Sequence, residues 1–491
     1  MSLTFIGLIQ LVLGLAIVLW GRLRTAFVFL IVSGLFSGSA AIALPALGGS
    51  TIPPVYFALG FVILRIVVPR GGYLGLVPEA ISANKWFLLF TFYGVAAAYV
   101  GPRLFAETIQ VFPMSAQNMR GMFDTVPLLP TSQNITAQVY MIGSLMMALC
   151  GFILCRRDGG KDTLISSAIF VSWAHVVLGL VAIAVRGTPL DAFLELFRNG
   201  NYVYMDSVAG GFVRIAGIFP ETSAYSAFAF SFFVLHAELW YRSIRPTANG
   251  WLAFVLALIL FFSTSSTAYL GLFSYFAFFM LRTVMLPHVA DQMKMVRVIM
   301  AMGAMGVGTA IVLAVNPGLP EMIWDMILVM TVDKSSSESG EMRWMWAMQG
   351  VRLLFETWGI GAGPGSFRSS SMITAMMGSV GVIGTVAFFV YLVQVVQPLR
   401  RSTWGPWDDD AVAIGGAFAS AALLGLVPMA VSSPQGYPDW IFSLLAGGAL
   451  ALRLQPRMQE EAPDYEEEAD YALADSPEYA LLGDTSPRST G

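Results

Sequence analysis

The stretch TAQVYMIGSLMMALCGFILC, residues 136–155, decides the fold of this chain. It carries no charged side chain, and a helix of this length measures about 30 Å, the thickness of the bilayer hydrocarbon. After the polar, basic segment RRDGGK at 156–161, a second apolar run follows at 163–185. The two runs predict two membrane-spanning helices joined by a short turn.

Apolar runs of this kind recur along the whole chain and predict an all-α, polytopic transmembrane helix bundle of about 12–13 spans. A run around Ser263–Thr267 is divided into two spans, because a single helix of about 36 residues would measure about 54 Å. The bundle occupies residues 1–457, and large loops that contain short helices connect its spans. The predicted spans are 3–20, 26–47, 53–69, 84–104, 136–155, 163–185, 222–243, 249–264, 267–286, 297–315, 373–398, 411–430 and 439–455.

The composition excludes most other classes of protein. Apolar residues make up 56% of the chain and charged residues 12%, against about 45–50% and about 25% in soluble domains. These values exclude a soluble enzyme, a fibre and a nucleic-acid-binding protein, and the length of the runs excludes an outer-membrane barrel. The two cysteines, Cys150 and Cys155, share one apolar run and indicate neither a disulfide nor a metal site.

The last residues differ in charge from the rest of the chain. Segment 458–491 holds ten acids and one base, a net charge of −9, so the remainder carries +5 of the total of −4. Such a segment, poor in large aliphatic residues, predicts a disordered tail. A solubilising tail and a docking tail for a cytosolic partner both fit.

The distribution of Lys and Arg predicts the orientation in the membrane. Seventeen of these residues fall in loops on one side of the predicted bundle and nine on the other. The richer side, together with the acidic tail, is therefore expected in the cytoplasm. The nine external bases are Arg103, Arg120, Arg186, Arg198, Arg214, Lys334, Arg343, Arg352 and Arg368.

Nearly all of these nine bases lie in three long external loops, 105–135, 186–221 and 316–372, and eight are arginines. Arginine is the residue best suited to planar, bidentate binding of phosphate. The pattern indicates an anionic, phosphate-bearing substrate. The alternative is that the arginines pair with acids of the same loops.

Loop 186–221 combines a predicted short helix with an arginine near the start of the next predicted span. Thr188 followed by Pro189 predicts a helix start, and the apolar stripe that follows predicts a helix in the membrane interface. Beyond it, Arg214 and Glu221 lie just before the span 222–243.

Loop 316–372, the largest, predicts an interfacial segment at 320–332 and a helix over about 338–358. Arg343 and Arg352 are nine positions apart on this helix and point to opposite sides. Arg352 has Glu356 at i+4 and is expected to pair with it. Arg343 has no acid at i+3 or i+4, which makes it the better candidate for binding substrate.

The run GIGAGPGSFR at 359–368 ends the same loop. Four glycines and a proline predict a tight, exposed backbone whose N–H groups can approach an anion. Gly361, Gly363 and Gly365 are therefore candidates for shaping a substrate pocket.

Four short motifs together resemble the bacterial O-antigen ligase and O-antigen polymerase family. Their order, spacing and predicted membrane side carry the resemblance, which covers about residues 210–395. The motifs are Arg214-x-x-Gly217-x-Phe219-x-Glu221, the turn Ser263-Thr264-Ser265-Ser266, Arg343-x-x-Trp346, and Gly359-Ile360-Gly361-x-Gly363-x-Gly365-x-Phe367 followed by Gly381-Val382-Ile383-Gly384.

The resemblance implies a membrane-embedded glycosyltransferase of the bacterial inner membrane that takes a glycan from undecaprenyl diphosphate at the periplasmic face. It implies no nucleotide sugar, no metal and no cofactor. The partners expected are the lipid-linked oligosaccharide, membrane lipids, a chain-length regulator and a flippase, with no nucleic acid. The product would be O-antigen, capsule or exopolysaccharide for a polymerase, or glycan on lipid A core for a ligase.

Ligases of the family carry a functional histidine in the large external loop, and this chain has none there. Its histidines are His175 and His236 within spans and His288 on the cytoplasmic side. The departure favours the polymerase over the ligase.

The chemistry assigns provisional roles to the external residues. Arg214 and Arg343, which match the family arginines that hold the lipid diphosphate, would stabilise the departing diphosphate. Glu221 is the first candidate for the general base, although a plain ion pair with an arginine is the competing interpretation. Arg352, Arg368 and Glu341 are the remaining candidates for contacting substrate.

Two alternatives from other classes remain open. A transporter or lipid-linked glycan flippase would also bind anionic lipids, but it should show inverted repeats and broken helices at the midplane. A non-catalytic scaffold would act through the acidic tail.

Overall fold

The computed structural model describes residues 2–454 apart from 46–48, 70, 115–123, 201–207, 210–211, 288, 290 and 316–337. The chain is mostly helical, and its described part contains helices long and apolar enough to cross a membrane, which is consistent with a multi-pass membrane protein. The six long ones are α5 (Lys85–Leu104), α6 (Ser132–Arg156), α7 (Gly160–Ala184), α11 (Ser266–Met285), α15 (Met372–Val396) and α17 (Asp410–Ser432).

A helix overlaps every one of the thirteen predicted apolar segments. The remaining seven are α1 (Phe5–Trp20), α2 (Leu23–Ser33), α3 (Pro54–Val67), α9 (Thr222–Tyr241), α10 (Pro246–Phe262), α12 (Gln292–Val315) and α18 (Trp440–Arg453). Connecting helices are η1 (Gly34–Phe36), η3 (Tyr73–Leu76), α4 (Val77–Ala83), α8 (Pro189–Glu195), α14 (Glu338–Glu356) and α16 (Arg401–Trp404).

Two predicted helix boundaries are confirmed, namely the start of α8 and the division between α10 and α11. Helix α8 has Thr188 as its N-cap and Pro189 in its first turn. The apolar run around Ser263–Thr267 is divided, with α10 ending at Phe262 and α11 beginning at Ser266. Between them Thr264 has a φ of 52°, and the Ser263 hydroxyl donates to the Leu260 carbonyl.

The segment 26–47 differs from the predicted continuous span. Its helix ends after η1, and the chain then forms a three-stranded antiparallel sheet of β1 (Ser2–Leu3), β2 (Ile42–Leu44) and β3 (Ser50–Ile52). The break follows from Gly38 and its serine neighbours, because a Cβ at Gly38 would lie 2.2 Å from the Ile218 carbonyl oxygen. The turn thus packs its backbone directly on the segment that precedes α9.

Helix α18 is the centre of the bundle. All of its residues are buried, and it packs on α6 and α17. Near one end of the neighbouring helix α9, the buried Glu238 carboxylate accepts hydrogen bonds from Arg242 and from Arg282 of α11. The Tyr275 hydroxyl also donates to Glu238, at 3.0 Å, so a buried ionic network joins α9 to α11.

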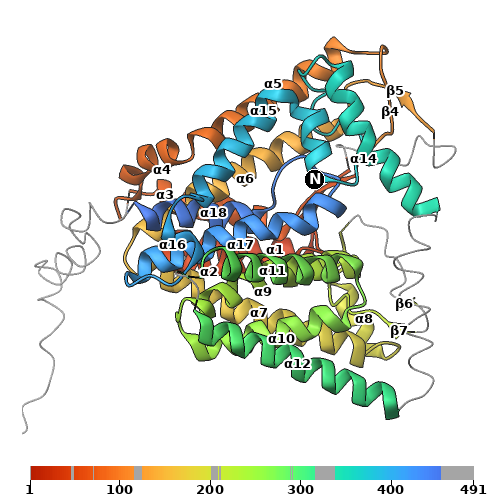
Figure 1. The fold of residues 1–491 in the computed structure, drawn as a ribbon. Coiled ribbons are helices and arrows are strands. Elements are labelled where there is room, and N and C mark those ends of the chain that lie inside the picture. The colour runs from red at the N-terminus through yellow and green to blue at the C-terminus, as the bar shows by residue number, and fades with distance from the viewer. Residues whose placement is uncertain are drawn as a thin grey trace, which may run out of the picture.

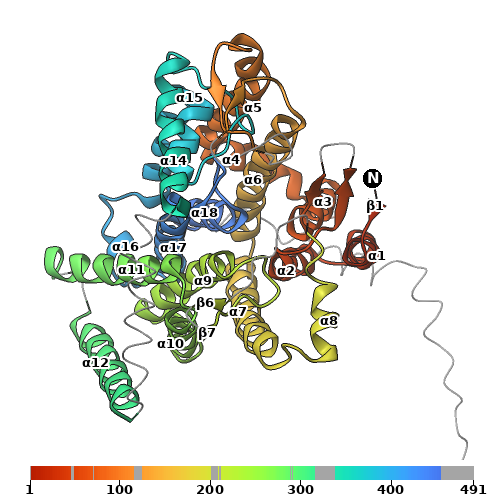
Figure 2. The same ribbon diagram turned by 90° about the vertical axis from the view of Figure 1, so that its right-hand side faces the viewer.

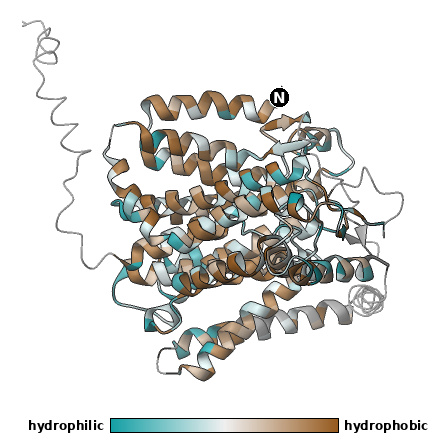
Figure 3. Ribbon diagram, turned by 90° about the horizontal axis from the view of Figure 1, so that it is seen from above, coloured by the Kyte–Doolittle hydropathy of each residue, from teal (hydrophilic) through white to brown (hydrophobic). Residues whose placement is uncertain are grey.

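Several short elements lie at one end of the bundle, on the right in Figure 1. Here lie α8, α14, the strand pair β4 (Gln110–Val111) and β5 (Val126–Pro127), and the pair β6 (Val208–Ala209) and β7 (Phe212–Val213). We call this end, formed by the described parts of 105–131, 186–221 and 338–371, the loop end. Figure 2 looks onto it, and Figure 3 shows the predominantly apolar colouring of the helices behind it.

The loop end therefore brings together the three segments that the sequence predicts on one membrane side. The predicted interfacial segment 320–332, the arginine at 120, the lysine at 334, His288 and the tail 458–491 lie outside the described residues.

Candidate functional site

Arg214 is half-buried in the segment that leads into α9. Its Nε is buried without a hydrogen-bond partner, and within the described ranges its guanidinium makes no ion pair or hydrogen bond. Burial lowers the pKa of Arg214 below its ordinary value, while the carboxylate of Glu221 acts in the opposite direction. Because arginine stays protonated in proteins, the side chain has donors to offer an anion.

Glu221 is the N-cap residue of α9 and is exposed. Its carboxylate accepts a hydrogen bond from the Ser223 hydroxyl. It is near enough to Arg214 to act on the charge of the guanidinium, yet among the described residues it forms no ion pair with it. The structure therefore shows no plain ion pair between Glu221 and Arg214, which was the competing interpretation of Glu221.

The side chain of Arg198, just after helix α8, holds the backbone after Arg214 in place. Arg198 donates from Nη2 to the Gly217 carbonyl at 2.7 Å, and its Nη1 lies 3.5 Å from the Asp191 carboxylate. The preceding residue, Phe197, accepts from the Ser39 hydroxyl. The turn after η1 and helix α8 together fix the segment that carries Arg214.

Helix α14 is continuous through Gly350 and presents Arg343 and Arg352 at positions that face apart. Arg352 lies 3.4 Å from Glu356, as predicted, and also donates to the Gln110 carbonyl. Arg343 and Glu341 are exposed, and neither side chain has a polar partner in the described part of the chain. The Arg352 side chain thus already contacts Glu356 and Gln110, whereas the Arg343 side chain has no such contact and can bind a ligand.

Arg368 is held against an aromatic ring. Its guanidinium carbon lies 4.1 Å from the ring centroid of Trp346, a cation–π contact with α14. Burial lowers the pKa of Arg368 below its ordinary value. The side-chain amide of Gln349 joins the same corner, since it donates to the Arg368 carbonyl and accepts from the Phe112 amide.

The glycine run packs into a break in α15. Gly381 interrupts that helix with a φ of 59°, and a Cβ there would lie 2.0 Å from the Gly359 carbonyl oxygen. The amides of Ala362 and Gly363 donate to Gly378 and Ser379, and the Val382 amide donates back to Gly359. The loop therefore supplies the hydrogen bonds that the broken helix lacks.

The glycine run is mostly buried, whereas the sequence predicts an exposed backbone there. The Gly361 amide donates to the Thr357 hydroxyl and the Gly363 amide to Ser379, so neither is free to bind an anion. A Cβ at Gly365 would lie 2.3 Å from the Gln133 carbonyl oxygen of α6. These glycines permit close backbone contact rather than phosphate binding.

Asn134 is a further site residue that sequence reasoning missed. Its side-chain amide donates to the Pro364 carbonyl and to the Ser366 hydroxyl, both at 2.8 Å, while its oxygen caps α6. It joins α6 to the glycine run. The signal available was the pattern Thr131-x-x-Asn134, a capping box at the start of an apolar run.

The structure brings Arg214 and Glu221 together at the mouth of α9, and it places Arg343, Glu341, Arg352 and Arg368 on or beside α14. The described residues record no contact between these two groups, although both lie at the loop end (Figure 1). Within the described ranges, the side chains of Arg214 and Arg343 are thus the two candidate arginines with neither an ion pair nor an aromatic contact.

Comparisons with known proteins add no family to this description. No protein-family model matches the chain, and a search of curated proteins gives no match. No group of three His, Cys, Asp or Glu side chains that could hold a metal ion occurs within the described ranges.

Proposed function

We propose that this protein polymerises undecaprenyl-diphosphate-linked oligosaccharide repeat units at the periplasmic face of the bacterial inner membrane. The observation that carries the proposal is Arg214, a half-buried guanidinium without a partner in the described chain, at the end of a helix bundle. In this arrangement the long apolar helices span the membrane, the loop end faces the periplasm, and the acidic tail lies in the cytoplasm.

The reaction needs cationic groups at the leaving diphosphate. The acceptor hydroxyl attacks the anomeric carbon of the donor sugar, the bond from that carbon to the diphosphate oxygen breaks, and undecaprenyl diphosphate leaves with the electron pair. Guanidinium groups that are already oriented stabilise this growing charge without reorganisation. Arg214 is the residue for this role, and Arg343 and Arg368 extend the cationic surface along the lipid-linked substrate.

The proton of the acceptor hydroxyl needs a base. Glu221 is suited to this role because its carboxylate is exposed, lies near Arg214 and forms no ion pair with that residue. Transfer of the proton to Glu221 completes the balance of the step. Glu341 on α14 is another exposed carboxylate of the loop end.

An assay with purified protein tests the proposal. The protein in detergent is mixed with undecaprenyl-diphosphate oligosaccharide repeat units, without nucleotide or metal, and the products are sized on a gel. A ladder of longer lipid-linked glycans is expected. Transfer only after addition of lipid A core would instead identify a ligase.

One observation favours a second candidate, a lipid-linked glycan flippase. Transporters use broken membrane helices as binding sites, and α15 is broken at Gly381. The glycine run occupies this break with its own backbone bonds, however, which leaves fewer groups for a substrate. Translocation of labelled lipid-linked repeat units across proteoliposomes, without growth in their length, would favour the flippase.

A further inference from the structure

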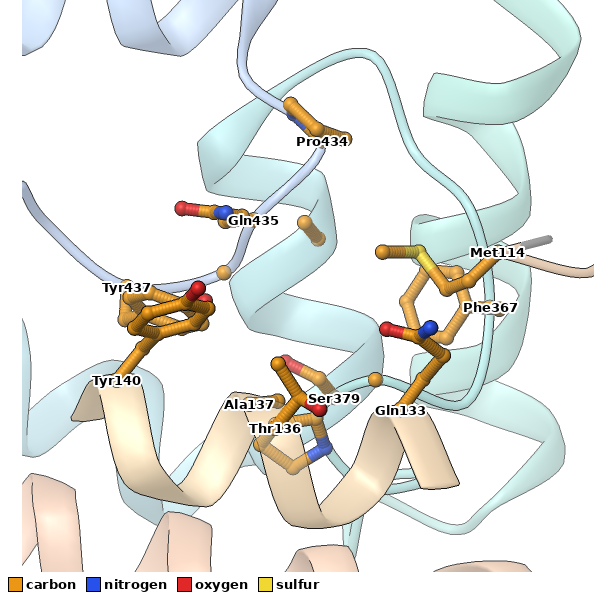
Figure 4. Close-up of a pocket in the computed structure, with 14 residues that line it drawn as sticks. Met114, Gln133, Thr136, Ala137, Tyr140, Phe367, Ser379, Pro434, Gln435 and Tyr437 are labelled. Carbon is orange, nitrogen blue, oxygen red and sulfur yellow. The ribbon is translucent and has the colours of Figure 1, made fainter. Parts of the chain in front are cut away.

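A pocket lies between α6, the glycine run, α15 and the segment 434–437 that leads into α18 (Figure 4). Its volume is about 60 Å³ and it is open on one side. None of the 14 side chains and backbones that line it is charged. The pocket is therefore a separate feature from the arginines, and its chemistry does not suit a diphosphate.

Two glutamine side chains give the pocket its polar character. Figure 4 shows Gln133 of α6 and Gln435 of the opposite segment on two sides of the cavity. No hydrogen bond to either side-chain amide occurs among the described residues. An amide both donates and accepts, so each of the two can bind a hydroxyl or acetamido group of a ligand.

Aromatic rings form the remaining walls. Tyr437 is buried, and its ring centroid lies 6.5 Å from that of Tyr140 on α6. Phe367, at the end of the glycine run, lines the other side together with Met114. Rings of this kind offer flat apolar surfaces beside polar groups, and a sugar ring has matching faces, with C–H groups on one side and hydroxyls at its edge.

The walls are held in place by close backbone packing. A Cβ at Gly436 would lie 2.7 Å from the Ser379 hydroxyl oxygen, and one at Gly365 would meet the α6 backbone. Asn134, next to Gln133, bonds to Pro364 and Ser366 of the glycine run. The pocket is thus formed before a ligand binds, as small-molecule sites usually are.

From these features we infer that the pocket is a binding site for one uncharged sugar unit of a glycan, whose edge enters between Gln133 and Gln435. The volume admits a small group of the sugar, such as a hydroxymethyl or acetamido group, rather than the whole ring. The inference rests on the proposed function for the identity of the glycan, which would be held here while Arg214 binds the diphosphate elsewhere at the loop end.

Binding of free sugars tests the inference without any catalytic step. Purified full-length protein is titrated by saturation-transfer NMR with neutral oligosaccharides of glucose, galactose, mannose and N-acetylglucosamine. At least one of them should bind. The double variant Gln133→Ala/Gln435→Ala should weaken that binding about tenfold, since each lost hydrogen bond costs a few-fold in affinity.

Gln138→Ala is the matched control, because Gln138 is on the same helix but does not line the pocket. It should leave the affinity unchanged. Binding by none of the sugars, or equal binding by the double variant and the wild type, would overturn the inference. If sugar binding depends on the two glutamines but the protein forms no polymer, the sugar-binding inference stands and only the proposed reaction is contradicted.

Discussion

The guanidinium of Arg198 donates to the carbonyl oxygen of Gly217 at 2.7 Å. This bond joins the segment just after helix α8 to the turn three residues after Arg214, where Gly217 has a φ of 55°. The position of Arg214 is therefore set by an element from the other end of its own loop. Arg198 is a positioning residue, since its two terminal nitrogens contact the Gly217 carbonyl and the Asp191 carboxylate.

Replacing Arg198 should slow the proposed polymerisation without abolishing it. Arg198→Ala removes the tether and lets the Arg214 segment sample other positions, so we expect the rate of chain growth to fall by about tenfold to a hundredfold. The rate is measured with the lipid-linked repeat unit at saturating and subsaturating concentrations. The control is Glu195→Gln, three residues earlier at the end of α8, where the side chain has no polar partner in the described part. Equal rates for both variants would contradict the positioning role.

The break in α15 should tolerate no side chain. Gly381→Ala places a Cβ 2.0 Å from the Gly359 carbonyl oxygen at a positive φ, which should destabilise the protein by about 2–3 kcal/mol or more. The comparison is Gly60→Ala in α3, where a Cβ meets no atom within 4 Å. Thermal unfolding in detergent should show a lower midpoint for the first variant only, and identical midpoints would mean that the break is not rigidly packed.

The buried ionic network should be sensitive to the loss of its single acid. Glu238→Gln leaves Arg242 and Arg282 buried without a counter-charge, and such changes cost about 3–5 kcal/mol. Glu356→Gln also removes the acid of an arginine pair, but that pair is exposed and should contribute less than about 1 kcal/mol. Unfolding midpoints of the two variants measure the difference. A mild effect at Glu238 would show that water reaches the network.

Hydrophobic periodicity and length were sufficient to locate the helices, because each apolar run is bounded by charged or turn-forming residues. They were insufficient at 26–47, where Gly38 ends the helical path for a reason outside its own neighbourhood, namely contact with the Ile218 backbone. The β-hairpin that replaces the predicted helix is short and apolar, and its residues fit either structure.

The candidate site was predicted in part. The i+4 spacing predicted the Arg352–Glu356 pair, and the unpaired state of Arg343 followed from the same rule. The contacts of Asn134, Arg198 and the glycine run join segments far apart in sequence, so no local pattern could predict them. The glycine spacing Gly378-x-x-Gly381-x-x-Gly384 was the one visible trace of the helix break.

The most direct test of the central claim is the rate of glycan polymerisation by the wild type, Arg214→Ala and Arg343→Ala. Each purified variant is incubated with the lipid-linked repeat unit, and the product ladder is quantified against Arg103→Ala, an exposed arginine that stacks on Tyr99. We predict loss of at least 100-fold at Arg214, a smaller loss at Arg343 and no loss at Arg103. Normal ladders from folded Arg214→Ala protein would contradict the account.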